Sequence, residues 1–130
     1  MKKSIEKNLN ELSERIKYYE GIRGRNIKLV AVTKTFSAEV IKKALSCGHK
    51  VFGESKLQEA LPKIEELRNE NIEWHFIGAV QTNKIRDIVK YFNWIQSVDS
   101  IGKLYKIREF AEKFDKQINY LIQINISGEQ

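Results

Sequence analysis

Residues 27–35, Ile-Lys-Leu-Val-Ala-Val-Thr-Lys-Thr, decide the fold class of this chain. The apolar, β-branched run that ends at Thr33 predicts a strand buried on both faces, as in a parallel sheet covered by helices. After this run, Ser37 is a suitable N-cap for a helix through residues 40–45, and Gly48 stands where a glycine commonly ends a helix. The segment therefore predicts one strand followed by one helix.

The same unit recurs along the whole chain. Further strands are predicted over residues 51–52, 72–77, 94–98 and 118–126. Helices are predicted over residues 5–19, 55–68, 82–92 and 100–114. Gly21 and Gly24 are expected to close the first of these helices, and Pro62 predicts a kink or restart in the second. We find no linker rich in Gly, Ser or Pro, so residues 1–130 are predicted to form a single α/β domain.

Regular strand–helix alternation predicts parallel strands joined by right-handed crossovers. Two architectures fit this pattern equally well. One is a five-stranded doubly wound sheet of the flavodoxin type. The other is the first part of a (β/α)₈ barrel of the TIM type, a fold that usually needs ~250 residues. Periodicity alone does not choose between them.

The composition excludes several classes of protein. The chain has 130 residues, of which 42% are hydrophobic and 31% are charged, which is typical of folded soluble proteins. Its longest apolar run, residues 29–32, is far shorter than the ~20 residues that span a bilayer, so no membrane association is expected. The N-terminal residues are charged and carry no apolar signal region, and the single Cys47 cannot form an internal disulfide. We therefore predict a cytoplasmic location.

The net charge of +6 is concentrated at one end of the chain. Residues 1–28 hold eight Lys and Arg against four Glu, whereas the remainder is nearly balanced. Such a segment could form a module that binds RNA or another polyanion. It could equally be a solvated helix face with pairs such as Glu11 and Arg15, and this is the interpretation we favour. Nucleic acid is therefore not an expected partner.

Lys34 is the strongest candidate for a reactive residue, because it directly follows the first predicted strand. Ligand sites of parallel α/β folds lie at the carboxyl ends of the strands. An ammonium held near apolar walls is desolvated, its pKa falls, and the neutral amine can attack a carbonyl to form a Schiff base. The alternative is a lysine that merely marks the solvated end of a strand.

The other candidates carry a weaker signal. His75 lies inside a predicted strand and is more simply explained as a hydrogen-bonded core histidine. Asp99 precedes a helix that it could help to start, and Glu54 and Glu59 show no pairing that marks a carboxylate dyad. Two scattered histidines and Cys47 do not make a zinc site of the usual spacing, so no metal is predicted.

Taken together, the strand ends resemble a known family. The matching stretches are AVTKT (31–35), FGES (52–55), QEA (58–60), WHFIG (74–78), QTNK (81–84), SVDS (97–100) and QIN (123–125). Their order and spacing are similar to those of the pyridoxal phosphate homeostasis proteins, which are relatives of the N-terminal domain of alanine racemase. The resemblance extends from the first helix to the end of the sequence.

This resemblance implies a fold-type III barrel that holds pyridoxal 5′-phosphate (PLP) as a Schiff base on Lys34. It also implies that Ser55, His75 and Asn125 face the cofactor pocket, and it favours the barrel over the flavodoxin-type sheet. The implied function is PLP binding in PLP homeostasis without established turnover, with PLP-requiring apo-enzymes as partners. A PLP-dependent racemase or decarboxylase is the enzymatic alternative.

Two features depart from the family pattern. Ser55 and Lys56 stand where the family more often has Asn followed by Tyr or Arg. The resemblance also covers only about five of the eight strands of a barrel, without the late loops that bind phosphate in such folds. We therefore expect a C-terminally truncated barrel, with unpaired edges at its first and fifth strands.

Overall fold

The computed structural model describes residues 4–124 and residue 126. The helices within these residues are α1 (Ile5–Arg23), α2 (Ala38–Ser46), α3 (Leu57–Glu66), α4 (Ile85–Tyr91) and α5 (Ile101–Lys113), with a short 3₁₀ helix η1 (Thr82–Lys84) before α4. The strands within them are β1 (Ala31–Val32), β2 (Val51–Glu54), β3 (Glu73–Phe76), β4 (Trp94–Val98) and β5 (Asn119–Ile122). Strands and helices alternate as the sequence predicts.

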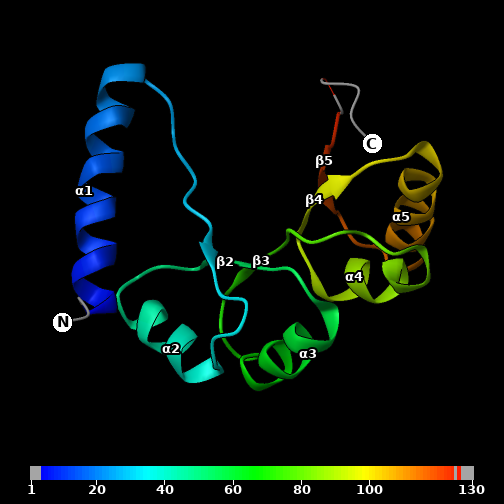
Figure 1. The fold of residues 1–130 in the computed structure, drawn as a ribbon, viewed down its shortest axis with the longest axis horizontal. Helices are drawn as coiled ribbons and strands as arrows, with labels where there is room; N and C mark the ends of the chain where they lie inside the picture. Colours follow the sequence, from blue (N-terminus) through cyan, green and yellow to red (C-terminus); the bar gives the residue numbers. More distant parts are fainter. Residues whose placement is uncertain (1–3, 125, 127–130) are drawn as a thin grey trace.

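All five described strands are parallel and lie in the order β1-β2-β3-β4-β5. Each crossover therefore steps to the next strand in the same direction, and crossovers of one hand place their helices on one face of the sheet. Figure 1 shows the strands along an open arc, with α2 to α5 on its outer side. A doubly wound sheet instead needs a point where the strand order reverses. The barrel-type α/β fold is confirmed, and the flavodoxin-type alternative is wrong.

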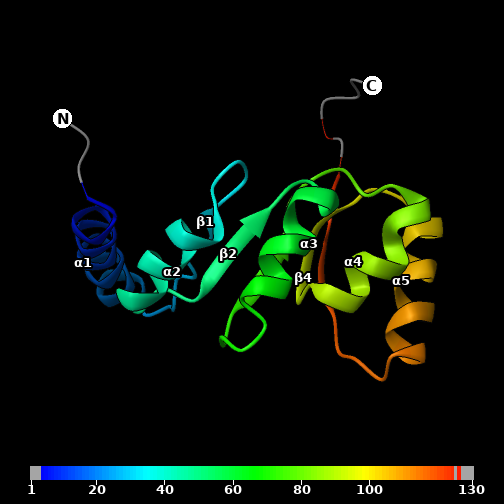
Figure 2. The ribbon, with the colours of Figure 1, turned by 90° about the horizontal axis from the view of Figure 1, so that it is seen from below.

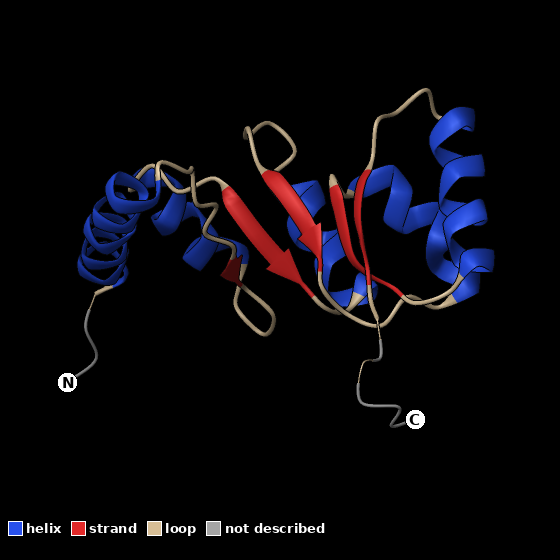
Figure 3. Cartoon of the chain, turned by 90° about the horizontal axis from the view of Figure 1, so that it is seen from above, coloured by secondary structure: helices blue, strands red, loops and turns tan. Residues whose placement is uncertain are grey.

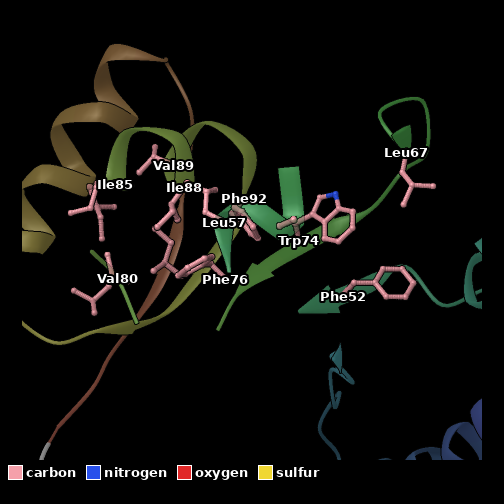
Figure 4. Close-up of a cluster of buried hydrophobic side chains, with 14 of the residues drawn as sticks. Phe52, Leu57, Leu67, Trp74, Phe76, Val80, Ile85, Ile88, Val89 and Phe92 are labelled. Atoms are coloured by element: carbon pink, nitrogen blue, oxygen red, sulfur yellow. The ribbon is translucent and has the colours of Figure 1, made fainter. Parts of the chain in front are cut away.

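The core lies between the sheet and its outer helices. Phe52, Trp74, Phe76 and Ile95 point from the strands into this layer and are almost completely buried. Figure 4 shows aromatic and aliphatic side chains of this layer. The rings of Phe76 and Phe92 pack edge to face, with their centres 5.2 Å apart. Burying each of these side chains contributes about 1.5–3 kcal/mol, so this layer supplies the main stabilisation of the fold.

Helix α1 confirms the first predicted helix but is attached loosely. The side chain of Ser4 accepts a hydrogen bond from the Lys7 amide, and Gly24 ends the helix in the left-handed conformation at φ 64°. Gly21, which was expected to help close the helix, lies inside it. No residue of α1 is buried; Ile5 and Leu9 alone among its side chains pack partly against the core. Figure 2 shows α1 at the β1 end of the sheet, beside α2.

The two outermost strands differ from the sequence prediction. The first was expected to be buried on both faces over residues 27–33, but β1 has two residues, and the exposed fractions of Ile27 and Val32 are 43% and 48%. Helices cover only one face of the described sheet. Strand β1 lies at its edge and has a neighbouring strand on one side only, so its residues are less buried than predicted. Strand β5 is likewise shorter than predicted, and all four of its residues are exposed.

Two helix boundaries also differ. Thr82 was expected to cap a helix directly, but it begins η1, and α4 starts three residues later. Helix α3 continues through Pro62 without a restart, and this proline lies on the exposed side. The caps at Ser37 and Ser100 are confirmed, because each hydroxyl accepts a hydrogen bond from an amide three residues ahead.

Lys116 joins the last two strand–helix units. Its Nζ donates hydrogen bonds to the carbonyls of Val89, Lys90 and Phe92, at 2.7, 3.0 and 2.7 Å. These carbonyls lie at the end of α4, where backbone acceptors lack partners within the helix. Burial lowers the pKa of the Lys116 ammonium, because desolvation disfavours the charged form. The side chain therefore caps α4 from the segment that leads into β5.

Candidate functional site

The inner face of the sheet is the face opposite the helices. Val32, Gly53, His75 and Trp94 are aligned across β1 to β4 by the strand register, and aligned residues of parallel strands point to the same side. Figure 3 shows the strands from above, with helices behind the middle of the sheet and at its two sides. The carboxyl ends of the strands meet at one edge of this face, which is where ligand sites of such folds are built.

Lys34 lies in a tight turn at the carboxyl end of β1. The Phe36 amide donates a hydrogen bond to the Thr33 carbonyl at 3.0 Å and closes the turn over residues 33–36. Thr33 is buried, whereas the Lys34 side chain is exposed. The described residues therefore do not provide the desolvated surroundings that the sequence argument invoked. They provide an accessible amine at the expected strand end.

A buried polar network anchors the residue before Lys34. The Nζ of Lys63, on α3, donates to the Thr33 carbonyl at 2.9 Å and to the Glu54 carboxylate at 2.9 and 3.1 Å. The Thr33 hydroxyl donates a short hydrogen bond to the same carboxylate. The Glu54 side chain is fully buried and that of Lys63 is 11% exposed. We call these three residues the Lys63 clamp.

Sequence reasoning missed the Lys63 clamp. It considered Glu54 only as a member of a carboxylate dyad, and it did not anticipate that a lysine would pair with this carboxylate. One signal was available, because Lys63 lies three residues after Ala60 and four before Leu67, and both are buried. This spacing places Lys63 on the core-facing side of the helix, where a lysine requires a partner.

His75 is a buried, hydrogen-bonded residue of the inner face. Its exposed fraction is 2%, and its Nε2 and Nδ1 lie 2.8 Å from Glu73 Oε2 and 2.9 Å from Gln96 Nε2. Its ring stacks on the Trp94 ring, with the ring centres 5.4 Å apart and an interplanar angle of 4°. The simpler sequence interpretation, a buried histidine with hydrogen-bond partners, is confirmed, and the placement of His75 at the cofactor pocket stays a prediction.

Lys28 extends this arrangement to the N-terminal segment. Its Nζ lies 2.8 Å from Glu73 Oε2 and 5.3 Å from the centre of the Trp94 ring. One charge of the basic segment is thus used in an internal ion pair. Burial raises the pKa of Glu73, but hydrogen bonds and charges from His75 and Lys28 outweigh it, and the net effect is a lowered pKa.

This lowered pKa predicts a pH-dependent contribution to stability. A carboxylate whose pKa is lower in the folded state stabilises the protein above its unfolded-state pKa, and that stabilisation is lost as the pH falls through the folded value. We expect Glu73→Gln to be less stable than the unaltered chain at pH 7, with the difference shrinking below about pH 4.5. Urea unfolding between pH 7 and pH 3 measures this difference. Glu109→Gln, on the exposed side of α5, is the control, and an E73Q difference independent of pH would contradict the prediction.

Ser55 lies beside a pocket on the helix side of the sheet. This pocket has a volume of about 440 Å³, is lined by Ser55, Gln58, Phe76 and Lys84 among others, and does not include Lys34 among its lining residues. The virtual Cβ of Gly78 would lie 2.0 Å from the Ser55 carbonyl oxygen, so the two backbones are in close contact. The Ser97 hydroxyl also donates a short hydrogen bond to the Gly78 carbonyl.

Two sequence candidates remain, Asn125 and Asp99. Asn125 lies outside the described residues. Asp99 pairs with Lys103 four residues later, at 2.8 Å, and the Lys103 hydrogen bond lowers the pKa of this carboxylate. Within the part of the chain that the structure describes, no three side chains of the metal-ligating types cluster, and no helix is long and apolar enough to cross a membrane.

Comparison with known proteins finds close relatives over most of the chain. The pyridoxal phosphate homeostasis protein of Synechocystis is 45% identical over 102 residues, which cover 78% of this chain and 47% of that protein. The protein of the same name from Vibrio alginolyticus is 35% identical, over 97% of this chain and 57% of its own length. The chain thus spans about half the length of the curated relatives it matches.

Solved structures agree with the fold. PipY of Synechococcus elongatus, determined without PLP, superposes with a TM-score of 0.87 at 29% identity, over 97% of this chain and 56% of PipY. The structure of PipY with PLP bound superposes with a TM-score of 0.76 at 30% identity, over 88% of this chain. The family model of the alanine racemase N-terminal domain matches residues 3–129, so the chain belongs to the alanine racemase N-terminal domain family, as the sequence motifs predicted.

Proposed function

We propose that this chain binds PLP through the amine of Lys34 and serves in PLP homeostasis. The observation that carries the proposal is the place of Lys34, an exposed amine at the carboxyl end of the first strand of a barrel-type sheet. The relatives named as PLP homeostasis proteins and the PLP-bound structure of PipY support it.

The residues present fit the reactive end of PLP. The PLP aldehyde condenses with a primary amine, forming a C=N bond and releasing one water, and this is the chemistry that the group supplies when bound. Among the described residues, the Lys34 amine has no hydrogen-bond or ion-pair partner. Lys28, Lys63 and Lys116, by contrast, are each held by carboxylates or carbonyls. Exposed lysines such as Lys42 also lack a partner within the part of the chain that the structure describes, so the place of Lys34 at the carboxyl end of β1 is what distinguishes its amine.

Binding and release of PLP is favoured over catalytic turnover. A racemase or decarboxylase needs a further acid–base group opposite the lysine. Both ring nitrogens of His75 are engaged by Glu73 and Gln96, so this buried histidine acts in packing and hydrogen bonding. We propose that the chain delivers PLP to PLP-requiring apo-enzymes, and the cytoplasmic location stays a prediction.

Trapping PLP on Lys34 tests the proposal. We expect PLP titration to produce a visible absorbance band, and borohydride reduction followed by peptide mass spectrometry to locate the adduct on Lys34. Lys34→Ala should abolish both signals, because the only proposed site of attachment is lost. Lys42→Ala, an exposed lysine of α2, is the matched control and should bind as the unaltered chain does. Labelling that spreads over surface lysines and persists in K34A would contradict the proposed function.

A further inference from the structure

The turn that carries Lys34 contains a residue in an unfavourable backbone conformation. Thr35 has a φ of 69°, in the left-handed region that β-branched residues rarely occupy. In a turn over residues 33–36, this position normally favours Gly or Asn. Such a conformation costs about 1–3 kcal/mol and persists only where the surrounding structure holds it. Residues that contact the turn must therefore hold it.

The Lys63 clamp is suited to this task. A lysine ammonium has three N–H donors and no acceptor. Three acceptors surround the Nζ of Lys63, namely the Thr33 carbonyl and both carboxylate oxygens of Glu54. The Thr33 carbonyl accepts in addition the Phe36 amide that closes the turn. One carbonyl oxygen thus links the buried ion pair to the turn that presents Lys34.

The clamp also ties this turn to its neighbours. The Thr33 amide donates to the Gly53 carbonyl at 3.0 Å, and the Ile77 amide donates to the Glu54 carbonyl at 2.9 Å. The ends of β1, β2 and β3 are therefore joined around the fully buried Glu54 carboxylate. Hydrogen bonds to charged groups in such surroundings are stronger than neutral ones and restrict movement.

We propose that Lys63 and Glu54 are positioning residues for the Lys34 amine. By fixing the Thr33 carbonyl, they hold the residue that directly precedes Lys34 and maintain the turn with Thr35 at positive φ. The part of this inference that concerns PLP rests on the proposed function. Neither Lys63 nor Glu54 touches the bound group in this role; each acts through the backbone.

The test is the double variant Glu54→Gln/Lys63→Met, which removes both buried charges together. Replacing a buried pair as a whole avoids leaving one charge unpaired, so the fold should survive. We expect amide hydrogen exchange at Phe36 to become about tenfold faster, the factor that corresponds to the loss of about one hydrogen bond. We expect the rate of borohydride-trapped PLP labelling at Lys34 to fall about tenfold as well. Acetylation of Lys34 by acetic anhydride should be unchanged, because the amine is exposed in either case.

Two controls and one substitute variant make the result decisive. Lys63→Arg keeps the charge and the donors and should recover most of the Phe36 protection, which a loss of packing alone would not explain. If the double variant does not fold, Glu54→Gln/Lys63→Gln is measured in the same way, since it also removes both charges but keeps amide donors at position 63. Lys103→Met, which breaks an exposed pair on α5, should change neither readout.

The outcomes separate the two proposals. Unchanged Phe36 exchange in a folded clamp variant overturns the positioning role, whether or not PLP binds. Faster Phe36 exchange with unchanged PLP labelling of Lys34 also overturns it, because the clamp would hold the turn without affecting the amine. If PLP fails to label Lys34 even in the unaltered chain, the proposed function fails, and Phe36 exchange alone then decides whether the clamp holds the turn.

Discussion

Replacing Gly78 with alanine is expected to destabilise the fold by about 4 kcal/mol or more, or to prevent folding. An ideal Cβ at this position would lie 2.0 Å from the Ser55 carbonyl oxygen and 2.8 Å from its carbonyl carbon. Both atoms belong to the backbone, so no side-chain rotation can relieve the overlap. The segments after β2 and β3 would have to separate, and the Ser97 hydroxyl would lose its fixed acceptor on Gly78.

Urea unfolding of the purified variants measures this effect. Gly102→Ala is the matched control, because a Cβ there meets nothing within 4 Å. Gly102 lies in the first turn of α5, and alanine is the better helix former, so this change should be neutral or stabilise by up to about 1 kcal/mol. A Gly78→Ala protein within about 1 kcal/mol of the unaltered chain would show that the two backbones do not approach as closely as described.

Lys63→Met is expected to destabilise the chain by about 3–5 kcal/mol. The substitution leaves the Glu54 carboxylate fully buried without its cation and leaves the Thr33 carbonyl without one of its donors. An unpaired buried charge is far more costly than the absence of the whole pair. Glu54→Gln/Lys63→Met should therefore be more stable than Lys63→Met alone.

Denaturant unfolding of the two single variants and the double variant measures this coupling. Lys103→Met provides the control, because the Lys103–Asp99 pair is exposed on the surface, with the Asp99 side chain 51% accessible. Because water screens an exposed pair, its loss should change the free energy of unfolding far less than the loss of the buried Lys63–Glu54 pair. Additive effects of Glu54→Gln and Lys63→Met would show that the two side chains do not form the pair that the structure places in the core.

Local structure was largely predictable because its signals lie within a few residues of each other. The helix caps at Ser37 and Ser100 depend on a hydroxyl and an amide three residues apart. Strand β4, Trp94–Val98, has the predicted bounds, and strand and helix alternate throughout as the periodicity indicates. Errors at Thr82 and at the ends of β1 arose where the extent of an element depends on what covers it.

The family was also evident from the sequence, because strand-end motifs keep their order and spacing whatever the surrounding packing. Lys34 could be placed at the end of β1 from this information alone, and it lies there in the structure. Its exposure could not be predicted in the same way. The degree of burial of a strand end depends on which elements stand opposite it, and periodicity within one segment carries no such information.

Signals within the amino-acid sequence were sufficient to predict the β/α alternation, the capped helices, the family and the candidate amine. Only the folded chain established the strand order, the covering of one face of the sheet, and the partners of the polar groups that pair over long sequence distances. Lys63 reaches the Thr33 carbonyl across 30 positions, and Lys28 reaches Glu73 across 45. These partners meet because parallel strands bring distant segments side by side. The Lys28–Glu73 pair is partly exposed, whereas the buried Glu54 carboxylate is stable only beside a complementary group.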